Sequence, residues 1–169
     1  MDKLIDGNLK YLEADDTYAS ARADTSANGQ HPYAVIVTCS DSRVPPEHIF
    51  GAGLGELFVV RTAGNVIGDF ERGTVEYAVG HLNVPLVVVM GHTHCGAVGA
   101  ALDAHGHHAE GSLGKLVSEI SGAIGTERNE PAAVKLNVRN SIARLRESAE
   151  LQTVKIAGAV YDIETGKVE

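Results

Sequence analysis

Three side chains that can take part in metal or acid–base chemistry occur within five residues, in the stretch VIVTCSDSRVPPEH. They are Cys39, Asp41 and Arg43. A guanidinium two positions after a carboxylate can form a bidentate ion pair, which would hold Asp41 ionised and oriented. The alternative is an ordinary surface pair without a function. We favour a functional pair, because these residues follow a strongly apolar run and stand beside a candidate metal ligand.

A second stretch, VMGHTHCGAVGAAL, has the same layout, because an apolar run ends and His92 and Cys95 follow with H-x-x-C spacing. Together with Cys39 they would offer two thiolates and one imidazole, a ligand set that suits zinc. Three protein ligands leave the fourth tetrahedral position open for water or substrate, as in catalytic zinc sites. Two alternatives remain at this point: a core histidine beside two buried thiols, or a redox pair of cysteines.

Runs of β-branched and aromatic residues predict four strands, at 33–38, 56–61, 84–90 and 153–163. The first three are apolar on both faces, as buried parallel strands are. Apolar residues with helical spacing lie between the runs, for example Val75, Ala78, Val79 and Leu82. This alternation predicts an α/β fold with a mostly parallel sheet of about four strands and helices on both faces. Ligands of such sheets gather at the carboxyl ends of the strands, so the two cysteines and His92 are expected to meet there.

The two ends of the chain carry separate predictions. Near the C-terminus, AVYDIETGKVE reads as a strand, a turn and a short return, which predicts an antiparallel edge strand. We interpret residues 1–169 as a single domain in which residues 1–21 form an N-terminal helical arm. The arm has only a weak apolar stripe, so we expect it to pack on a partner; the stripe residues are Leu4, Ile5, Leu9 and Leu12.

Composition excludes several classes of function. The chain has 14 Lys and Arg against 22 Asp and Glu, a net charge of −8, and no basic run, which argues against nucleic-acid binding. No stretch approaches the roughly 20 apolar residues that span a bilayer. We therefore expect a cytoplasmic protein without membrane partners, and in the reducing cytosol its two cysteines are not expected to form a disulfide.

The two motifs together, CSDSRVPPEHIF and GHTHCGAVGAAL, resemble the β-class carbonic anhydrases, whose metal motifs are C-x-D-x-R and H-x-x-C. The resemblance covers most of the chain, including ELFVVRTAGN, GTVEYAVGHLNV and GAVYDIETGKV. It implies a carbonic anhydrase that binds zinc through Cys39, His92 and Cys95, with Asp41 and Arg43 as the catalytic dyad.

The resemblance extends to the substrate pocket of the plant-like branch of that family, because Gln30, Phe58 and Tyr77 match its glutamine, phenylalanine and tyrosine. With Val44, Phe58 would give CO2 a dry wall, and the Gln30 amide would donate to a product oxygen. His81 resembles a histidine suggested as a proton shuttle; a solvated helix histidine is the alternative. The resemblance also implies a homodimer or higher homo-oligomer, with the N-terminal helix across the partner and a pocket lined from both subunits.

The implied reaction is attack of a zinc-bound hydroxide on CO2 to give bicarbonate and a proton, with the hydroxide oriented by the dyad. In a closed state of the family the aspartate itself takes the fourth zinc position. Alternatives are hydrolysis of COS or CS2 by the same centre, and a non-catalytic zinc or redox protein. A bacterial branch that bicarbonate inhibits has Trp where this chain has Ile36, so that regulation is not expected. His94 could compete for the metal, but we expect it to point to solvent; the cluster His105, His107 and His108 could bind metal adventitiously, but we expect a solvated loop.

Overall fold

The computed structural model describes residues 1–13, 16–104 and 110–169, so the cluster His105, His107 and His108 lies outside the described residues. Along the chain the elements are α1 (Asp2–Glu13), α2 (Asp16–Asn28), β1 (Ala34–Cys39), α3 (Pro46–Ile49), β2 (Leu57–Thr62), the single 3-10 turn η1 (Ala63–Asn65), α4 (Asp69–Leu82), β3 (Leu86–His92), α5 (Gly96–Asp103), α6 (Gly111–Ile124), α7 (Glu130–Arg146) and β4 (Lys155–Tyr161).

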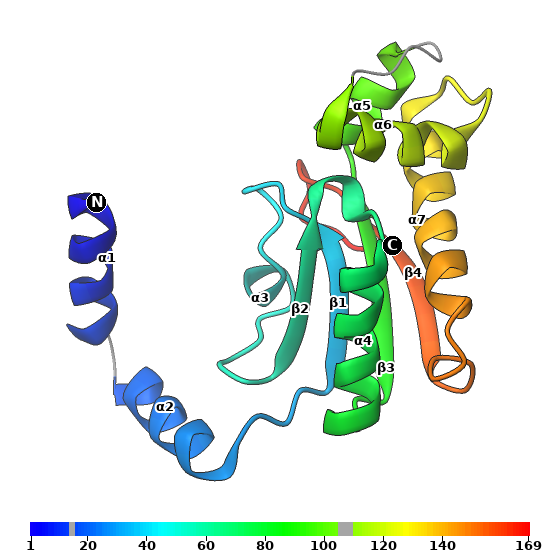
Figure 1. Cartoon of the computed structure of the whole chain (residues 1–169). Helices are drawn as coiled ribbons and strands as arrows, with labels where there is room; N and C mark the ends of the chain where they lie inside the picture. Colours follow the sequence, from blue (N-terminus) through cyan, green and yellow to red (C-terminus); the bar gives the residue numbers. More distant parts are fainter. Residues whose placement is uncertain (14–15, 105–109) are drawn as a thin grey trace.

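The four predicted strands form one sheet in the order β2-β1-β3-β4, and every neighbouring pair is parallel (Figure 1). This confirms the predicted α/β class and the parallel sheet. Every residue of β1 is buried, which explains its continuous apolar sequence. Strand β3 ends at His92, two residues beyond the predicted run, so this histidine belongs to the strand itself.

The predicted antiparallel edge strand is wrong. The chain does turn back after β4, but it makes a single antiparallel bridge, between Tyr161 and Val168. The reason is the turn, in which the Asp162 carboxylate accepts the backbone N–H groups of Glu164 and Thr165. Beside this bridge, backbone hydrogen bonds join Val160 to Glu169 and the Asp162 N–H to the Lys167 carbonyl, but the return is not a strand of the sheet.

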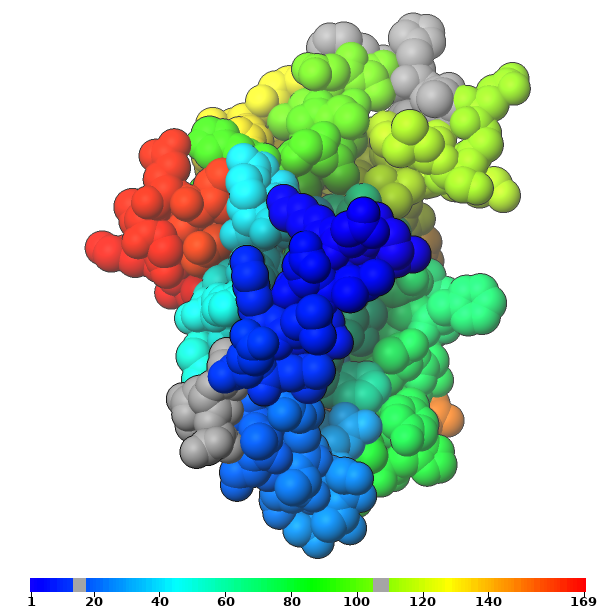
Figure 2. Space-filling model, turned by 90° about the vertical axis from the view of Figure 1, so that its left-hand side faces the viewer, coloured from blue at the N-terminus to red at the C-terminus, as the bar shows by residue number. Residues whose placement is uncertain are grey.

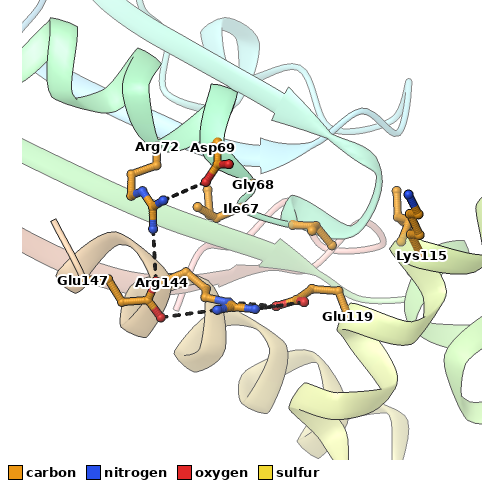
Figure 3. A pocket seen from close by; sticks show the side chains of 10 residues that line it. Ile67, Gly68, Asp69, Arg72, Lys115, Glu119, Arg144 and Glu147 are labelled. Carbon is orange, nitrogen blue, oxygen red and sulfur yellow. Dashed lines mark hydrogen bonds and ion pairs between the residues drawn. The ribbon is translucent and has the colours of Figure 1, made fainter. Parts of the chain in front are cut away.

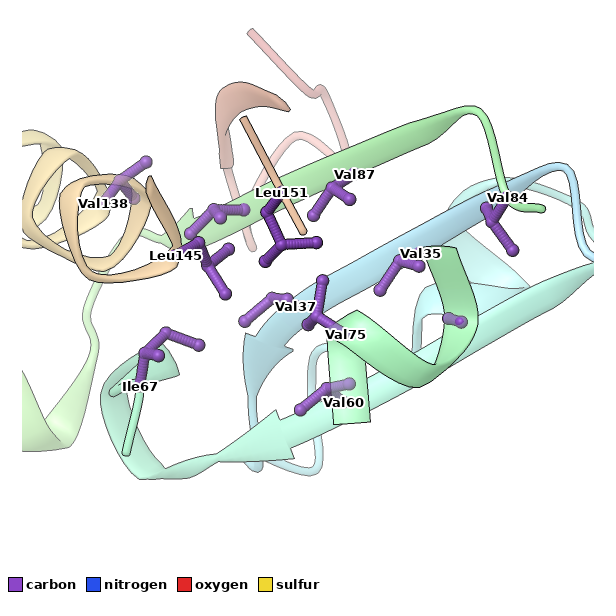
Figure 4. Close-up of a cluster of buried hydrophobic side chains, with 12 residues drawn as sticks. Val35, Val37, Val60, Ile67, Val75, Val84, Val87, Val138, Leu145 and Leu151 are labelled. Carbon is purple, nitrogen blue, oxygen red and sulfur yellow. The ribbon is translucent and has the colours of Figure 1, made fainter. Parts of the chain in front are cut away.

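The main core lies between one face of the sheet and the helices α4 and α7 (Figure 4). Alternate residues of β1 and β3 point into it, with Val75 of α4 and Leu145 of α7 on the helix side. The opposite face carries Ile36 and Met90 and packs against the short helix α3 and the chain around Val44. Helices therefore contact both faces, but two long helices cover one face and a single turn lies on the other.

Helix α7 crosses close to β3 at Gly91. A Cβ at this position would lie 2.8 Å from Val138 Cγ2 and 2.9 Å from Val134 Cγ1, so only glycine fits beneath the helix. The glycine precedes His92 directly, and the close packing fixes the end of β3 against a rigid helix.

The N-terminal helices α1 and α2 stand to one side of the sheet, and the view from that side shows them in front of the rest of the chain (Figures 1 and 2). Helix α1 has no buried residue, and Leu4, Ile5, Leu9 and Leu12 are each more than half exposed. In the described part of the chain no helix combines the length and the apolar character needed to cross a membrane.

Candidate metal centre

The two cysteines and His92 come together at the carboxyl edge of the sheet. Cys39 is the last residue of β1, His92 is the last residue of β3, and Cys95 precedes the first residue of α5. From β1 the chain goes to β2 on one side, and from β3 it goes to β4 on the other, so the connections diverge between these two adjacent strands. At this switch point the ligand atoms of the three side chains all lie within 4.8 Å of one another.

The histidine of this cluster presents one nitrogen to the cysteines. His92 is fully buried, and its Nδ1 lies 2.9 Å from the carbonyl oxygen of Thr93, to which it donates. Its Nε2 has no hydrogen-bond partner among the described residues. A buried polar atom without a partner is costly, and a metal ion bound at Nε2 would remove that cost.

The two cysteines share one proton, so one of the two thiols ionises more readily than a free thiol. The hydrogen bond from the Cys95 thiol, against the opposing effect of burial, lowers the pKa of Cys39. The same shared proton raises the pKa of Cys95. The backbone N–H groups of Gly64 and Asp41 also donate to Cys39 Sγ, at 3.2 and 3.4 Å. Two thiols and one imidazole form a soft donor set, so the residues present fit a metal cofactor.

Beside the cluster lies the ion pair that the sequence predicted. Arg43 Nε donates to Asp41 Oδ1 at 3.0 Å, and Arg43 Nη2 donates to Asp41 Oδ2 at 2.7 Å. These bonds hold the pKa of Asp41 well below its usual range, and they raise the pKa of Arg43. Asp41 Oδ2 is 3.9 Å from His92 Nε2, so an ionised carboxylate borders the atoms that would hold the metal.

Sequence reasoning missed Arg61 as a support of this pair. Its Nε donates to the Cys39 carbonyl at 3.1 Å and its Nη2 donates to the Asp41 carbonyl at 2.7 Å. Arg61 thus fixes the backbone on which the thiol and the carboxylate stand. The available signal was an arginine at the end of an otherwise apolar predicted strand, at 56–61.

A buried polar network holds the turn that donates to Cys39. Asn137 and Ser141 of α7 donate to the carbonyls of Gly64 and Asn65, at 2.7 and 2.8 Å. Gly64 has a φ of 65°, and a Cβ there would lie 2.7 Å from Ile120 Cδ1. The network was not predicted, because its members are more than 70 positions apart in the sequence.

Comparison with known proteins identifies the family. The sequence model described as carbonic anhydrase matches residues 34–168. The chain belongs to the carbonic anhydrase family. It is 37% identical to a carbonic anhydrase of Mycolicibacterium smegmatis, over 98% of this chain and 89% of that protein. It is 45% identical to carbonic anhydrase 2 of Mycobacterium tuberculosis, over 85% of this chain and 67% of that protein.

Solved structures agree. The crystal structure of a β-carbonic anhydrase of Aspergillus fumigatus matches with a TM-score of 0.83 at 29% identity, over 99% of this chain and 88% of that one. The suspected resemblance to β-class carbonic anhydrases is therefore confirmed.

The predicted pocket residues of this carbonic anhydrase divide into two groups. Val44 is fully buried next to the dyad, and its N–H donates to the Asp41 carbonyl. Phe58 lies near the start of β2, opposite Val35, four residues before Cys39 along the paired strand. At about 3.3 Å per residue, Phe58 is about 13 Å from the metal edge of its own subunit.

The other predicted pocket residues accompany Phe58. The Tyr77 ring is 6.1 Å from that of Phe58 and is half exposed, and the His81 ring is 5.2 Å from that of Tyr77. Gln30 is exposed and lies between α2 and β1. It therefore stands before the start of β1, whereas the metal ligand Cys39 is the last residue of that strand. Within one chain, Gln30, Phe58, Tyr77 and His81 are therefore not brought to the metal cluster.

A separate cavity of about 390 Å³ lies between the start of α4 and the helices α6 and α7 (Figure 3). Apart from Lys115, which also lines it, the charged groups of the cavity pair with one another: Arg72 contacts Asp69 and Glu147, and Arg144 contacts Glu119 and Glu147. Because these paired groups satisfy one another, we interpret the cavity as an ionic link between helices and not as a second reaction site.

Proposed function

We propose that this protein catalyses the reversible hydration of CO2 to bicarbonate and a proton, at a zinc ion held by Cys39, His92 and Cys95. The observation that carries the proposal is the pairing of the three-ligand cluster with a neighbouring bidentate dyad. Structural zinc sites are usually closed by four protein ligands, whereas a catalytic site keeps one position open. When bound, zinc lowers the pKa of a coordinated water to about 7, so that hydroxide is available at neutral pH.

Asp41 and Arg43 are proposed as the catalytic dyad. Two thiolates reduce the effective charge of a metal, so help from a neighbouring group is needed. The Asp41 carboxylate accepts a hydrogen bond from the nucleophile and directs its lone pair toward CO2. Arg43 holds both carboxylate oxygens, which supports the state in which Asp41 stays off the metal.

The substrate pocket is proposed to form between two copies of the chain. Phe58 and Tyr77 lie at the opposite end of the strands from their own metal cluster, yet Tyr77 is half exposed. In a homodimer they would complete the partner's site, with Gln30 as a donor to the product and His81 as a candidate proton shuttle. Val44 would line the pocket from the same subunit as the metal.

The N-terminal arm is proposed as part of the same dimer contact. In the described part of residues 1–21, which includes α1 and the start of α2, the side chains of Leu4, Ile5, Leu9 and Leu12 are more than half exposed. Packing on a second copy would remove this apolar surface from water. A cytoplasmic location is also proposed, because zinc-binding thiols must remain reduced.

Stopped-flow measurement of CO2 hydration on protein loaded with one zinc per chain tests the activity. We expect a rate well above buffer that a chelator removes and zinc restores. No rate above buffer would refute the proposal. COS and CS2 are tested in parallel, because faster turnover of either would identify a different linear substrate for the same centre. A native protein without zinc would instead favour the redox interpretation.

A further inference from the structure

His94 lies between two metal-ligand positions, yet its contacts lead away from the metal cluster. Its backbone φ is 55°, in the left-handed region that residues with a Cβ rarely adopt. In this conformation its carbonyl oxygen accepts a hydrogen bond from Arg43 Nη2 at 3.1 Å. The same nitrogen donates to Asp41 Oδ2, so His94 supplies a third contact to the guanidinium that holds the dyad.

The His94 side chain is braced from two sides. Its Nδ1 is 3.6 Å from Glu130 Oε2, and its Nε2 is 3.5 Å from Glu164 Oε1. Glu130 is the first residue of α7, and Glu164 lies in the turn after β4. The imidazole thus links the metal loop to two elements that are distant in sequence. An unfavourable backbone conformation persists only where surrounding contacts hold it in this way.

Thr93, which precedes His94, connects the loop between β3 and α5 to the end of β4. The Thr93 N–H donates to the Tyr161 carbonyl at 3.0 Å, and its hydroxyl oxygen accepts from the Ile163 N–H at 3.1 Å. These bonds fix the loop as far as Thr93. The next carbonyl, which Arg43 uses, belongs to His94, in the short segment between Thr93 and the start of α5 at Gly96.

We propose that His94 is a positioning residue for the Asp41–Arg43 dyad. Its carbonyl holds the guanidinium, and its imidazole, between two carboxylates, holds the carbonyl in place. The Arg43 backbone N–H donates to Asp41 Oδ1 at 2.9 Å and ties the carboxylate to its own loop, whereas the long, half-exposed Arg43 side chain reaches the metal loop through the His94 carbonyl. This last bond anchors the pair to the metal loop. This inference rests on the proposed function, because it concerns the orientation of the proposed dyad.

The first test is independent of activity. Nuclear magnetic resonance of ¹⁵N-labelled protein follows hydrogen exchange at Arg43 Nε, which the bond to Asp41 protects. We expect His94→Ala to raise this exchange rate at least about fivefold, while His48→Ala, an exposed histidine on α3, leaves it unchanged. Unchanged exchange in His94→Ala would overturn the proposal, even if the protein does not hydrate CO2.

The second test asks whether His94 acts through Arg43. With one zinc per chain verified, we expect His94→Ala to lower kcat about fivefold or more with little change in KM. In an Arg43→Lys background the same substitution should lower kcat less than twofold, because the shared contact is already lost. Equal losses in both backgrounds would overturn the proposal. A wild type without hydration activity would refute the proposed function, and the exchange measurement would still decide the role of His94.

A rescue variant separates positioning from folding. Asparagine accepts the left-handed conformation readily, and its amide can donate to either flanking carboxylate. We expect His94→Asn to recover most of the kcat and the exchange protection that His94→Ala loses. Failure of the asparagine to recover either, in a variant with unchanged circular dichroism and zinc content, would contradict bracing by the side chain.

Discussion

At the scale of single residues, the site depends on which atoms are left without partners and which are fully engaged. His92 Nε2 has no hydrogen bond in the described chain, whereas both oxygens of Asp41 are held by Arg43. The first atom is therefore available to a metal, and the second group is kept ionised and in a fixed orientation. This difference is the physical basis for proposing His92 as a metal ligand and Asp41 as the group that orients the nucleophile.

Removing the negative charge of Asp41 should separate binding from reaction. We expect Asp41→Asn to keep one zinc per chain, because the three ligands are untouched, and to lower kcat for CO2 hydration at least about 100-fold. Zinc analysis and stopped-flow kinetics measure the two effects. Asp103→Asn, which changes an exposed carboxylate at the end of α5, is the matched control. Full activity in Asp41→Asn would show that the carboxylate does not orient the nucleophile.

At the scale of elements, the metal edge depends on helices that supply no ligand. Helix α7 holds η1 through Asn137 and Ser141, and η1 in turn donates an N–H to Cys39. Helices α4, α6 and α7 are joined by the ionic contacts around Arg72 and Arg144 (Figure 3). The geometry of the ligands is therefore set by packing between elements.

A side chain at position 64 should disturb this support. Gly64→Ala places a Cβ 2.7 Å from Ile120 Cδ1 in a left-handed backbone, so we expect the free energy of unfolding to fall by about 2 to 3 kcal/mol. Zinc affinity should fall as well, because the Gly64 N–H would move from Cys39 Sγ. Denaturant unfolding and zinc titration measure these changes. Gly80→Ala in α4, which meets no atom within 4 Å, should not destabilise the protein, and equal effects of the two variants would contradict the explanation.

The link between α6 and α7 should depend on pH. Hydrogen bonds from Arg144, opposed by burial, lower the pKa of Glu119. A carboxylate with a lowered folded-state pKa stabilises the protein fully above its unfolded pKa of about 4.3, and this contribution is lost as pH falls through the lower folded-state value. We therefore expect Glu119→Gln to cost about 1 kcal/mol at pH 7 and less at pH 4.

Chemical denaturation of wild type and Glu119→Gln at the two pH values measures this difference. Glu13→Gln, at the exposed end of α1, is the control and should change stability little at either pH. A cost that stays constant or grows on acidification would show that the Arg144 pair is not the source of the stabilisation.

At the scale of the whole molecule, the proposed pocket residues do not reach the metal cluster of their own chain. The metal cluster lies at one edge of the sheet, while Phe58 and Tyr77 stand about four strand positions away, and α1 leaves its apolar stripe exposed. A second copy would cover the stripe and bring the aromatic residues to a metal edge. Activity and assembly should therefore be lost together.

A charge in the α1 stripe tests this coupling. Leu9→Asp would bury a carboxylate in the proposed contact, so we expect a monomer by analytical ultracentrifugation and a kcat/KM at least about tenfold lower, with zinc retained. Lys10→Asp, which places the same side chain on the opposite, exposed face of α1, should keep both the oligomer and the activity. An active monomer would show that one chain completes its own pocket.

Much of this could be predicted from residue types and their spacing. The continuous apolar strands and the helical spacing between them predicted the parallel sheet, and the positions of Cys39, His92 and Cys95 at or just after the strand ends predicted that the ligands meet. These features depend on local patterns and on the rule that parallel strands share a carboxyl edge. The bidentate contact between Asp41 and Arg43 followed from a two-residue spacing in the same way.

Only the tertiary structure decided the supports of the site, because their partners are far apart in the chain. Arg61 reaches the backbone beside Cys39 from the neighbouring strand, and Asn137 reaches η1 from 73 positions away. The turn at Asp162, and not the strand pattern around it, decided that the return makes one bridge instead of an edge strand. His94 had no role in the sequence, because its bracing by Glu130 and Glu164 exists only after α7 and the C-terminal turn have folded against the metal loop.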